Sequence, residues 1–173
     1  MVIASFGSLT GAHFATVTGL PGGYEVTYDL TNKQIKLTAL STGFAGWIGP
    51  FGVSNPAADA DPDNDGIPNA LEYVLGANPA QPDSGLAPTV TTSGGNMVFT
   101  FLRTDTSETS DISLIVEAGG DLATWPETYT ISPGTPPSGV FIEENASAPD
   151  SITVTIPQGA TAKFARLKVL VAP

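Results

Sequence analysis

Cysteine is absent from the 173 residues, and histidine occurs once, as His13. Without cysteine the chain has no disulfide bonds, no thiolate metal site and no cysteine nucleophile. One histidine does not make a histidine-rich zinc site, and a lone histidine in an apparent strand is usually structural. The sequence also lacks the Gly-x-Ser-x-Gly elbow, the P-loop and the dinucleotide-binding fingerprint. We therefore expect a protein that is not an enzyme.

Basic residues are scarce, since 6 lysines and arginines stand against 17 aspartates and glutamates, for a formal net charge of −11. This balance argues against binding to nucleic acid or to an anionic membrane surface, because both need basic patches. No apolar run is long enough to span a bilayer, and the N-terminal residues lack the features of a signal peptide. We expect that a signal peptide has been removed or, as we favour, that the chain is a piece of a longer secreted protein.

Charged residues make up only 13% of the chain and hydrophobic residues 41%. A chain of this kind can fill hydrophobic cores and does not have the composition of an acidic disordered tail. Its 19 glycines and 15 prolines favour many short strands and turns. We therefore predict a mainly β fold.

One stretch, from Asp61 to Glu72, reads D-x-D-x-D-G-x-x-N-x-x-E. Ca²⁺ takes about six to eight oxygen ligands, which a short loop supplies only if its side chains alternate inward and the chain then turns sharply. Gly66 permits that turn because it lacks a Cβ. The spacing predicts the following ligands: Asp61, Asp63, Asp65, the backbone carbonyl of Ile67, Asn69 directly or through water, and Glu72 as a bidentate group.

Two alternatives to a calcium site are an acidic solvated loop and a magnesium site. Four carboxylates this close in sequence would repel one another without a cation. Mg²⁺ is disfavoured because it dehydrates reluctantly and seldom uses an all-protein cage. Asp59, just before the loop, is either an extra outer ligand or simply exposed.

The same segment predicts a short helix over Asn69–Leu75. Pro68 suits a first helical turn, Gly76 suits the C-terminal stop, and Pro79 prevents continuation. Three apolar residues recur at helical spacing and should pack on a neighbouring element: Leu71, Val74 and Leu75. We expect the bound ion to act as a hinge that fixes the angle between the parts before and after it.

Near the N-terminus, Tyr24–Leu30 and Gln34–Ala39 alternate apolar and polar residues around a short polar turn, which predicts a β-hairpin. An earlier strand is expected over His13–Thr18. A sheet of three or four strands is thin and needs cover on one face. The rest of the chain, repeats upstream or another copy of the protein would supply that cover.

Later in the chain, apolar alternation and regularly spaced turn residues predict an antiparallel β-sandwich. Its predicted strands are Met97–Arg103, Ile112–Ala118, Glu127–Ser132, Gly139–Glu143, Ser151–Ile156 and Lys163–Val171. The glycine- and aromatic-rich run Gly43–Gly52 is expected to form a short helical turn against the calcium segment. The predicted parts are a β unit 1–45, a connector 46–58, the calcium loop and helix 59–79, a linker 80–88 and the β-sandwich 89–173.

The run Ala57–Pro79, AADADPDNDGIPNALEYVLGANP, resembles a bacterial thrombospondin type 3-like calcium repeat and is similar to one half of a dockerin. A dockerin has two such loops and this chain has one. In secreted proteins of verrucomicrobial and planctomycetal type, such a run is often followed by a terminal β module. Segments of the second half resemble that module: Phe99–Arg103, Ile115–Ala118, Asp121–Trp125 and Phe164–Val169.

The first 45 residues resemble the last rungs of an autotransporter-like β repeat region, notably Tyr28–Leu30 and Ile35–Leu37. Together these resemblances imply an extracellular or cell-surface module that binds Ca²⁺ at the end of a large protein. They also imply that the module has no catalytic activity of its own.

Three functions are therefore open. The first is a non-catalytic extracellular structural or adhesion module with a calcium-stabilised hinge between two β units. The second is a subunit of a self-assembling fibre that is joined by strand addition. The third is a carbohydrate-binding module that uses Trp125 or Trp47, although each tryptophan is also explained by packing. A glycosidase would need one pair of carboxylates at a fixed separation, for which the available residues are Asp111, Asp121, Glu127, Glu143 and Glu144.

Overall fold

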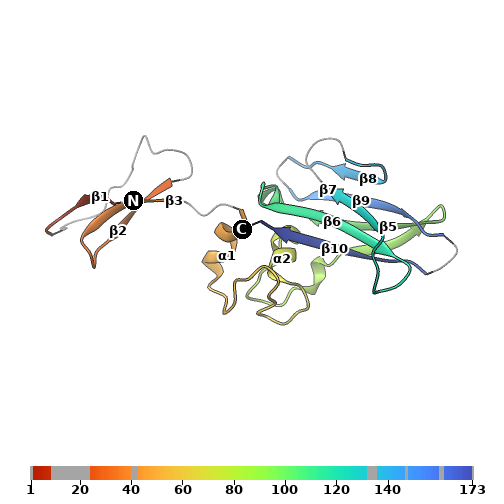
Figure 1. Ribbon diagram of the computed structural model, residues 1–173, viewed down its shortest axis with the longest axis horizontal. Coiled ribbons are helices and arrows are strands. Elements are labelled where there is room, and N and C mark those ends of the chain that lie inside the picture. Colours follow the sequence, from red (N-terminus) through yellow and green to blue (C-terminus); the bar gives the residue numbers. More distant parts are fainter. Residues whose placement is uncertain are drawn as a thin grey trace. The chain divides into compact units, whose positions relative to one another are not determined.

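The computed structural model describes residues 2–8, 24–39, 43–131, 136–146, 148–159 and 162–172. The chain divides into two compact units, Met1–Thr42 and Gly43–Pro173. The described strands form three antiparallel sheets, so the prediction of a mainly β fold is confirmed (Figure 1). The strand expected over His13–Thr18 lies outside the described residues.

The first unit contains strands β1 (Val2–Ser5), β2 (Tyr24–Asp29) and β3 (Gln34–Ala39), in the order β1-β3-β2. Strands β2 and β3 form the predicted hairpin. Asp29 closes its turn by accepting hydrogen bonds from the backbone and side-chain nitrogens of Asn32, both at 2.9 Å. These bonds and the bond from Lys36 hold the pKa of Asp29 well below its usual range.

The second unit contains a β-sandwich of two sheets, β4-β5-β9-β8 and β10-β6-β7. All six predicted strands are present, each within one residue of the predicted ends. The additional strand, β4, was not predicted. The strand bounds are β4 (Thr89–Ser93), β5 (Asn96–Arg103), β6 (Ile112–Gly119), β7 (Glu127–Ile131), β8 (Val140–Glu143), β9 (Asp150–Pro157) and β10 (Phe164–Val171).

The sandwich core is built from residues that alternate along the strands, because successive side chains of a strand point to opposite faces. Strand β9 shows the pattern clearly, with Ile152, Val154 and Ile156 fully buried and the residues between them more exposed. Both sheets contribute to a single buried cluster, which includes Phe99 from β5 and Val116 from β6. The two sheets therefore pack face to face, as expected for a sandwich.

Two short α-helices, α1 (Gly43–Ile48) and α2 (Asn69–Leu75), lie at one end of this unit (Figure 1). Helix α2 has the predicted bounds, and it ends at Gly76, whose φ of 81° is left-handed and whose N–H bonds to the carbonyl of Glu72. Three 3₁₀ turns complete the described helical structure: η1 (Gly49–Phe51), η2 (Ser84–Leu86) and η3 (Asp105–Ser107).

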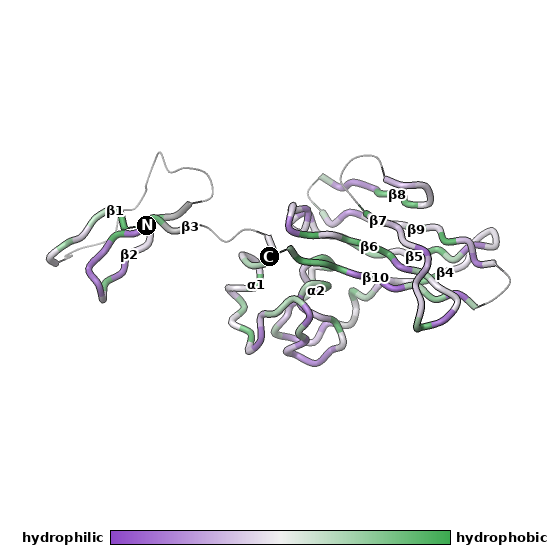
Figure 2. The backbone as a smooth tube through the Cα atoms, viewed as in Figure 1, coloured by the Kyte–Doolittle hydropathy of each residue, from purple (hydrophilic) through white to green (hydrophobic). Residues whose placement is uncertain are grey.

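Helix α2 is buried on two sides. Leu71, Val74 and Leu75 pack on a neighbouring element as predicted, and that element is the sandwich core. Tyr73 packs in a second cluster with Phe44 and Ile48 of α1. The loops beside α2 are largely hydrophilic, in contrast to the apolar run along β6 (Figure 2). The helix therefore joins two hydrophobic clusters within one unit.

The segment Ala57–Pro79, for which the sequence predicts a calcium site, lies inside the second unit. The unit boundary falls between Thr42 and Gly43, whereas α2 packs against β10 and β5 of the sandwich. The expected boundary at residue 45 lies within α1. The segment is thus part of the second unit, whereas the sequence pattern predicts a hinge between two β units.

Candidate metal centre

The segment from Asp61 to Glu72 folds into a loop whose backbone N–H groups turn toward its own carboxylates. Asp61 accepts hydrogen bonds at both oxygens, from the N–H of Asp65 at 3.2 Å and that of Gly66 at 3.0 Å. Oδ1 of Asp65 accepts a bond from the N–H of Ile67 at 2.8 Å. Gly66 has a φ of 92°, which L side chains rarely adopt. The sharp turn therefore lies at the predicted glycine.

This turn brings three of the predicted ligands together. Asp61, Asp63 and Asp65 each present a carboxylate oxygen within 4.8 Å of the others. Oδ2 of Asp63 is buried and has no hydrogen-bond partner. Burial raises the pKa of Asp63, and the charges of Asp65 and Asp61 add to this effect. Three carboxylates held this close are mutually repulsive unless a cation lies among them.

Glu72 lies on α2 and is the most unusual acidic residue of the loop. Its side chain is fully buried, and neither of its carboxylate oxygens has a hydrogen-bond partner. Burial raises the pKa of Glu72 to about 7, with further contributions from the charges of Asp63, Asp65 and Asp61. Glu72 is not part of the group of oxygens within 4.8 Å of one another. It nevertheless lies close enough to the three aspartates for their charges to raise its pKa.

Ile67 and Asn69 link the loop to its surroundings. The side chain of Ile67 enters the sandwich core, which anchors the backbone whose carbonyl is the predicted ligand. Nδ2 of Asn69 donates to the carbonyls of Asn55 at 3.0 Å and Ala57 at 2.8 Å. Its Oδ1 is buried and has no partner. Asn69 therefore ties the loop to the preceding segment and keeps one oxygen available for a metal or a bound water.

Sequence reasoning missed a contact from outside the loop. The N–H of Asp83, in the linker that follows α2, donates to Oδ2 of Asp65 at 2.8 Å. The carboxylate of Asp83 is also among the charges that raise the pKa of Glu72. Spacing along the chain gives no signal for this contact, because the linker reaches the loop only after α2 has turned the chain back.

A second acidic group lies at the end of β5, around Arg103. The guanidinium of this buried arginine forms ion pairs with Asp150 at 2.7 Å, with Glu144 at 3.6 Å and with Glu108. The three acids present oxygens within 4.8 Å of one another and so have the geometry of a metal site. Arg103 already supplies a cation there, and the group is therefore explained as an ion-pair network.

The two tryptophans make packing contacts. The ring of Trp47 lies 5.0 Å from that of Phe51 and 5.1 Å from that of Tyr73, between ring centroids. The guanidinium of Arg166 lies over the ring of Trp125, 4.3 Å from its centroid. These contacts favour packing over a sugar-stacking surface for both residues.

Four of the five acids considered for a glycosidase pair have separate structural contacts, Glu144 being paired with Arg103, and Glu143 is exposed on β8. Asp111 accepts a bond from the N–H of Phe44 at the start of α1, and Asp121 accepts bonds within its own turn. Glu127 forms an ion pair with Lys163. His13, the one histidine, lies outside the described residues.

In the parts of the chain that are described, no helix is long and apolar enough to cross a membrane. Comparison of the chain with protein-family models, with curated proteins and with solved structures found no match.

Proposed function

We propose that this protein is a non-catalytic extracellular or cell-surface module with a structural or adhesive role, stabilised by one Ca²⁺ in the loop from Asp61 to Glu72. The proposal rests on the chemistry of the loop. Five of its predicted ligands are carboxylates or amides with oxygen donors, and the sixth is a backbone carbonyl.

The main support for the proposal is that the carboxyl group of Glu72 is buried and has no hydrogen-bond partner. A buried carboxylate without a hydrogen bond or an opposite charge is strongly unfavourable, so buried charges in proteins are normally paired or bind a metal. Both oxygens of Glu72 lack a partner, and so does Oδ2 of Asp63. Among the described residues, no lysine or arginine forms an ion pair with the acids of this loop. A divalent cation would satisfy these oxygens together.

Calcium fits this donor set better than other metals. The donors are all hard oxygens, which select against copper and against zinc–thiolate sites. Three monodentate aspartates, one carbonyl and a bidentate glutamate would give about six ligands, within the range that Ca²⁺ accepts. Extracellular sites bind Ca²⁺ with dissociation constants of about 10⁻⁴–10⁻³ M, so even a weak site suits that compartment.

The position of α2 gives the ion a structural role. Residues of this helix pack in the sandwich core and in the α1 cluster, and Asn69 bonds to the segment that precedes the loop. A cation bound by Glu72 and the aspartates would fix the helix against its loop. In a chain without disulfide bonds, this closure would serve as the crosslink of the second unit.

Calorimetric titration and thermal unfolding test the proposal. Metal-free wild-type protein should bind one Ca²⁺ per chain, and its melting temperature should rise with Ca²⁺ concentration. Glu72→Gln and Asp63→Asn should each weaken binding strongly. Glu143→Gln, which removes an exposed acid of β8, is the matched control and should bind like the wild type. Absence of both binding and stabilisation in the wild type would reject the proposal.

A second candidate, a fibre subunit joined by strand addition, is favoured by the exposure of β1. All four residues of this strand are exposed, including Val2 at 47% and Ile3 at 48%, and β1 pairs only with β3 in the described part of the first unit. An apolar edge strand of this kind can pair with another chain. Electron microscopy should then show filaments that Ile3→Lys prevents, whereas monomers at all protein and Ca²⁺ concentrations would reject this candidate.

A further inference from the structure

The linker 80–88, which connects α2 to β4, folds back onto the metal loop, which is the candidate metal-binding segment from Asp61 to Glu72. The N–H of Asp83 donates to Oδ2 of Asp65 at 2.8 Å, across 18 positions of sequence. Oδ1 of Asp65 is already bonded to the N–H of Ile67 within the loop. Asp65 thus connects the metal loop to the linker through its two carboxylate oxygens.

The side chain of Asp83 is held beside this contact. Its Oδ1 accepts a bond from the N–H of Gly85 at 3.3 Å, which caps the short turn η2. Its Oδ2 accepts no hydrogen bond from the described residues. The carboxylate is exposed and lies outside the group of three aspartates that approach within 4.8 Å, but it belongs to a residue whose backbone N–H is bonded to Asp65.

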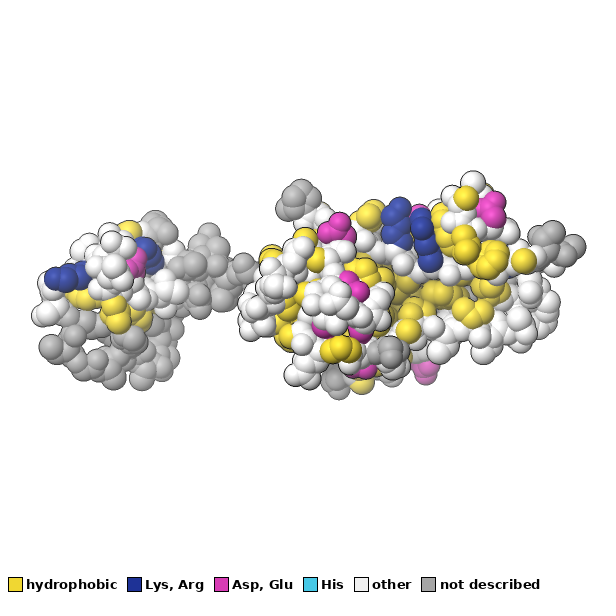
Figure 3. Space-filling model, turned by 90° about the horizontal axis from the view of Figure 1, so that it is seen from below, with side chains coloured by type: hydrophobic (Ala, Val, Ile, Leu, Met, Phe, Trp, Pro, Cys, Tyr) yellow, Lys and Arg dark blue, Asp and Glu magenta, His cyan; other side chains and the backbone are white. Residues whose placement is uncertain are grey.

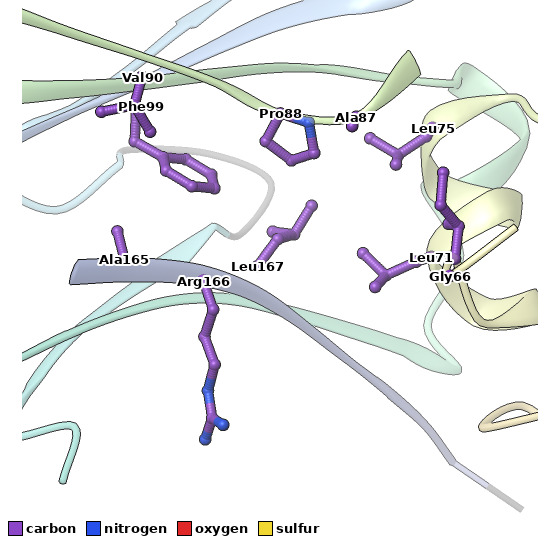
Figure 4. A pocket seen from close by; sticks show the side chains of 11 residues that line it. Gly66, Leu71, Leu75, Ala87, Pro88, Val90, Phe99, Ala165, Arg166 and Leu167 are labelled. Carbon is purple, nitrogen blue, oxygen red and sulfur yellow. The ribbon is translucent and has the colours of Figure 1, made fainter. Parts of the chain in front are cut away.

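The linker also forms part of a groove in the second unit. This groove, of about 330 Å³, is lined by residues of the metal loop, α2, the linker and strands β4, β5 and β10. Figure 4 shows Leu71 and Leu75 of α2 facing it, with Pro88 of the linker across from them, whereas Arg166 points away. Gly66 lies at the loop side of the groove. A bond between the metal loop and the linker therefore connects two parts of the groove lining.

We propose that Asp83 belongs to the calcium site, which its carboxylate completes from outside the twelve-residue loop, so that the ion fastens the linker and the groove wall to the metal loop. This inference rests on the proposed binding of Ca²⁺. It adds a ligand group that the loop motif does not contain, and it makes the arrangement of the groove dependent on the metal.

Substitution of Asp83 with asparagine provides a clean test. The Asp83→Asn variant keeps the backbone N–H that bonds to Asp65 and retains a side-chain oxygen for the N–H of Gly85, so the change removes mainly charge. Glu143→Gln is the matched control, because Glu143 is an exposed acid of β8, outside the loop and the linker. Asp83→Glu tests whether a carboxylate on a longer side chain restores binding.

Calorimetry should show Ca²⁺ binding weakened about 10- to 100-fold in Asp83→Asn, the range found when groups supporting a metal site are removed. Glu143→Gln should change the affinity by less than about threefold, and Asp83→Glu should recover part of the loss. In chelator, the melting temperature of Asp83→Asn should be equal to or above that of the wild type, because a like charge has been removed. This last measurement separates a role at the metal from a role in folding.

Hydrogen exchange adds a second readout. Ca²⁺ should slow exchange of the backbone amides of Asp83 and Gly85 in the wild type, and this protection should be lost in Asp83→Asn. If the wild type binds Ca²⁺ but Asp83→Asn binds it no more weakly than Glu143→Gln does, the inference about Asp83 is wrong and the calcium module stands. If the wild type does not bind Ca²⁺, the proposed function fails, and this inference fails with it.

Discussion

The second unit contains two groups of three close acidic side chains, one around Arg103 and one in the metal loop. In the described part of the chain, only the first group has a basic side chain among its acids. Around Arg103, three acids share an arginine that is only 5% exposed. In the metal loop, Asp61, Asp63 and Asp65 approach as closely, yet the described residues place no arginine or lysine in ion pairs with them.

This difference shows how a buried carboxylate is accommodated. Asp150, 2% exposed, is satisfied by Arg103 and by the N–H of Asn145. Glu72, fully buried, has no partner for either oxygen. The first group contains its own cation, whereas none of the described lysines and arginines supplies a cation to the second. We propose Ca²⁺ as that cation.

The largest effect should come from removing the internal cation. Arg103→Met leaves Asp150 buried and unpaired, which typically costs about 3–5 kcal/mol of the free energy of unfolding. The double variant Arg103→Met/Asp150→Leu should recover most of this loss, because neither charge is then buried alone. Urea denaturation should give the same loss with Ca²⁺ and with chelator. A loss that disappears in Ca²⁺ would contradict the separation of the two groups.

The next effect should come from Glu72→Gln, and its sign should depend on the metal. With Ca²⁺ at about 100 times its dissociation constant the wild type gains about 2.7 kcal/mol, and the variant should lose most of that gain. In chelator above about pH 7 the variant should be the more stable protein, because it lacks a buried negative charge. Denaturation curves of the wild type and the variant, each recorded in Ca²⁺ and in chelator, measure this reversal of their relative stability. A variant less stable by the same amount in both would show a packing role only.

The pH dependence of the metal-free protein sharpens this comparison. Burial is the main cause that raises the pKa of Glu72 to about 7 in the fold, from an ordinary value of 4.5. Below about 4.5 the carboxyl is protonated in both states and carries no penalty, and above about 7 it is ionised in both and carries the full penalty. The stability of the metal-free wild type relative to Glu72→Gln should therefore fall as pH rises between these values. A flat difference across that window would be inconsistent with the burial of Glu72.

A smaller effect is expected from the turn that gathers the three aspartates. An added Cβ at Gly66 meets nothing within 4 Å, so Gly66→Ala tests the positive φ alone. The left-handed conformation costs an L residue about 1–2 kcal/mol, and the free energy of unfolding should fall by that amount. Gly49→Ala is the control, since its Cβ is also free of contacts and its φ is not positive. Equal losses for the two variants would remove the special role of Gly66.

The smallest effect should come from removing one of the two exposed basic partners of Glu117. Glu117 on β6 pairs with Arg166 and Lys168 of β10, and the Arg166 guanidinium holds the pKa of Glu117 below its usual value. Figure 3 shows basic side chains of the second unit gathered beside hydrophobic ones. Because Lys168 is 41% exposed and Arg166 still pairs with the buried Glu117 in its absence, Lys168→Ala should lower the free energy of unfolding by less than about 1 kcal/mol, and added salt should shrink the difference. A loss as large as that of Arg103→Met would contradict this ranking.

Local patterns predicted much of this fold. The β2–β3 hairpin, helix α2 and six sandwich strands follow from alternation, helical spacing and turn residues, all of which act over a few positions. Strand β4 was missed because Thr89–Ser93 has one apolar residue, Val90, and all its side chains are exposed. The strand orders of the two sheets could not be predicted, because neighbours such as β5 and β9 are far apart in sequence.

The candidate metal site likewise has a local part that the sequence predicts and a distant part that it does not. The motif spacing predicted that Asp61, Asp63 and Asp65 would come together around a glycine turn, because that geometry is local. It gave no sign of Asp83, which arrives through the packing of α2. The pairing of Arg103 with Asp150, 47 positions apart, depends likewise on the register of β5 with β9.

A crystal structure of the protein grown with Ca²⁺, with data collected for anomalous scattering, tests the central claim most directly. The account predicts one anomalous peak in the loop, with oxygens of Asp61, Asp63, Asp65 and Glu72 at about 2.3–2.6 Å from it. Absence of a peak, with the Glu72 carboxylate directed away from the three aspartates, would contradict the account.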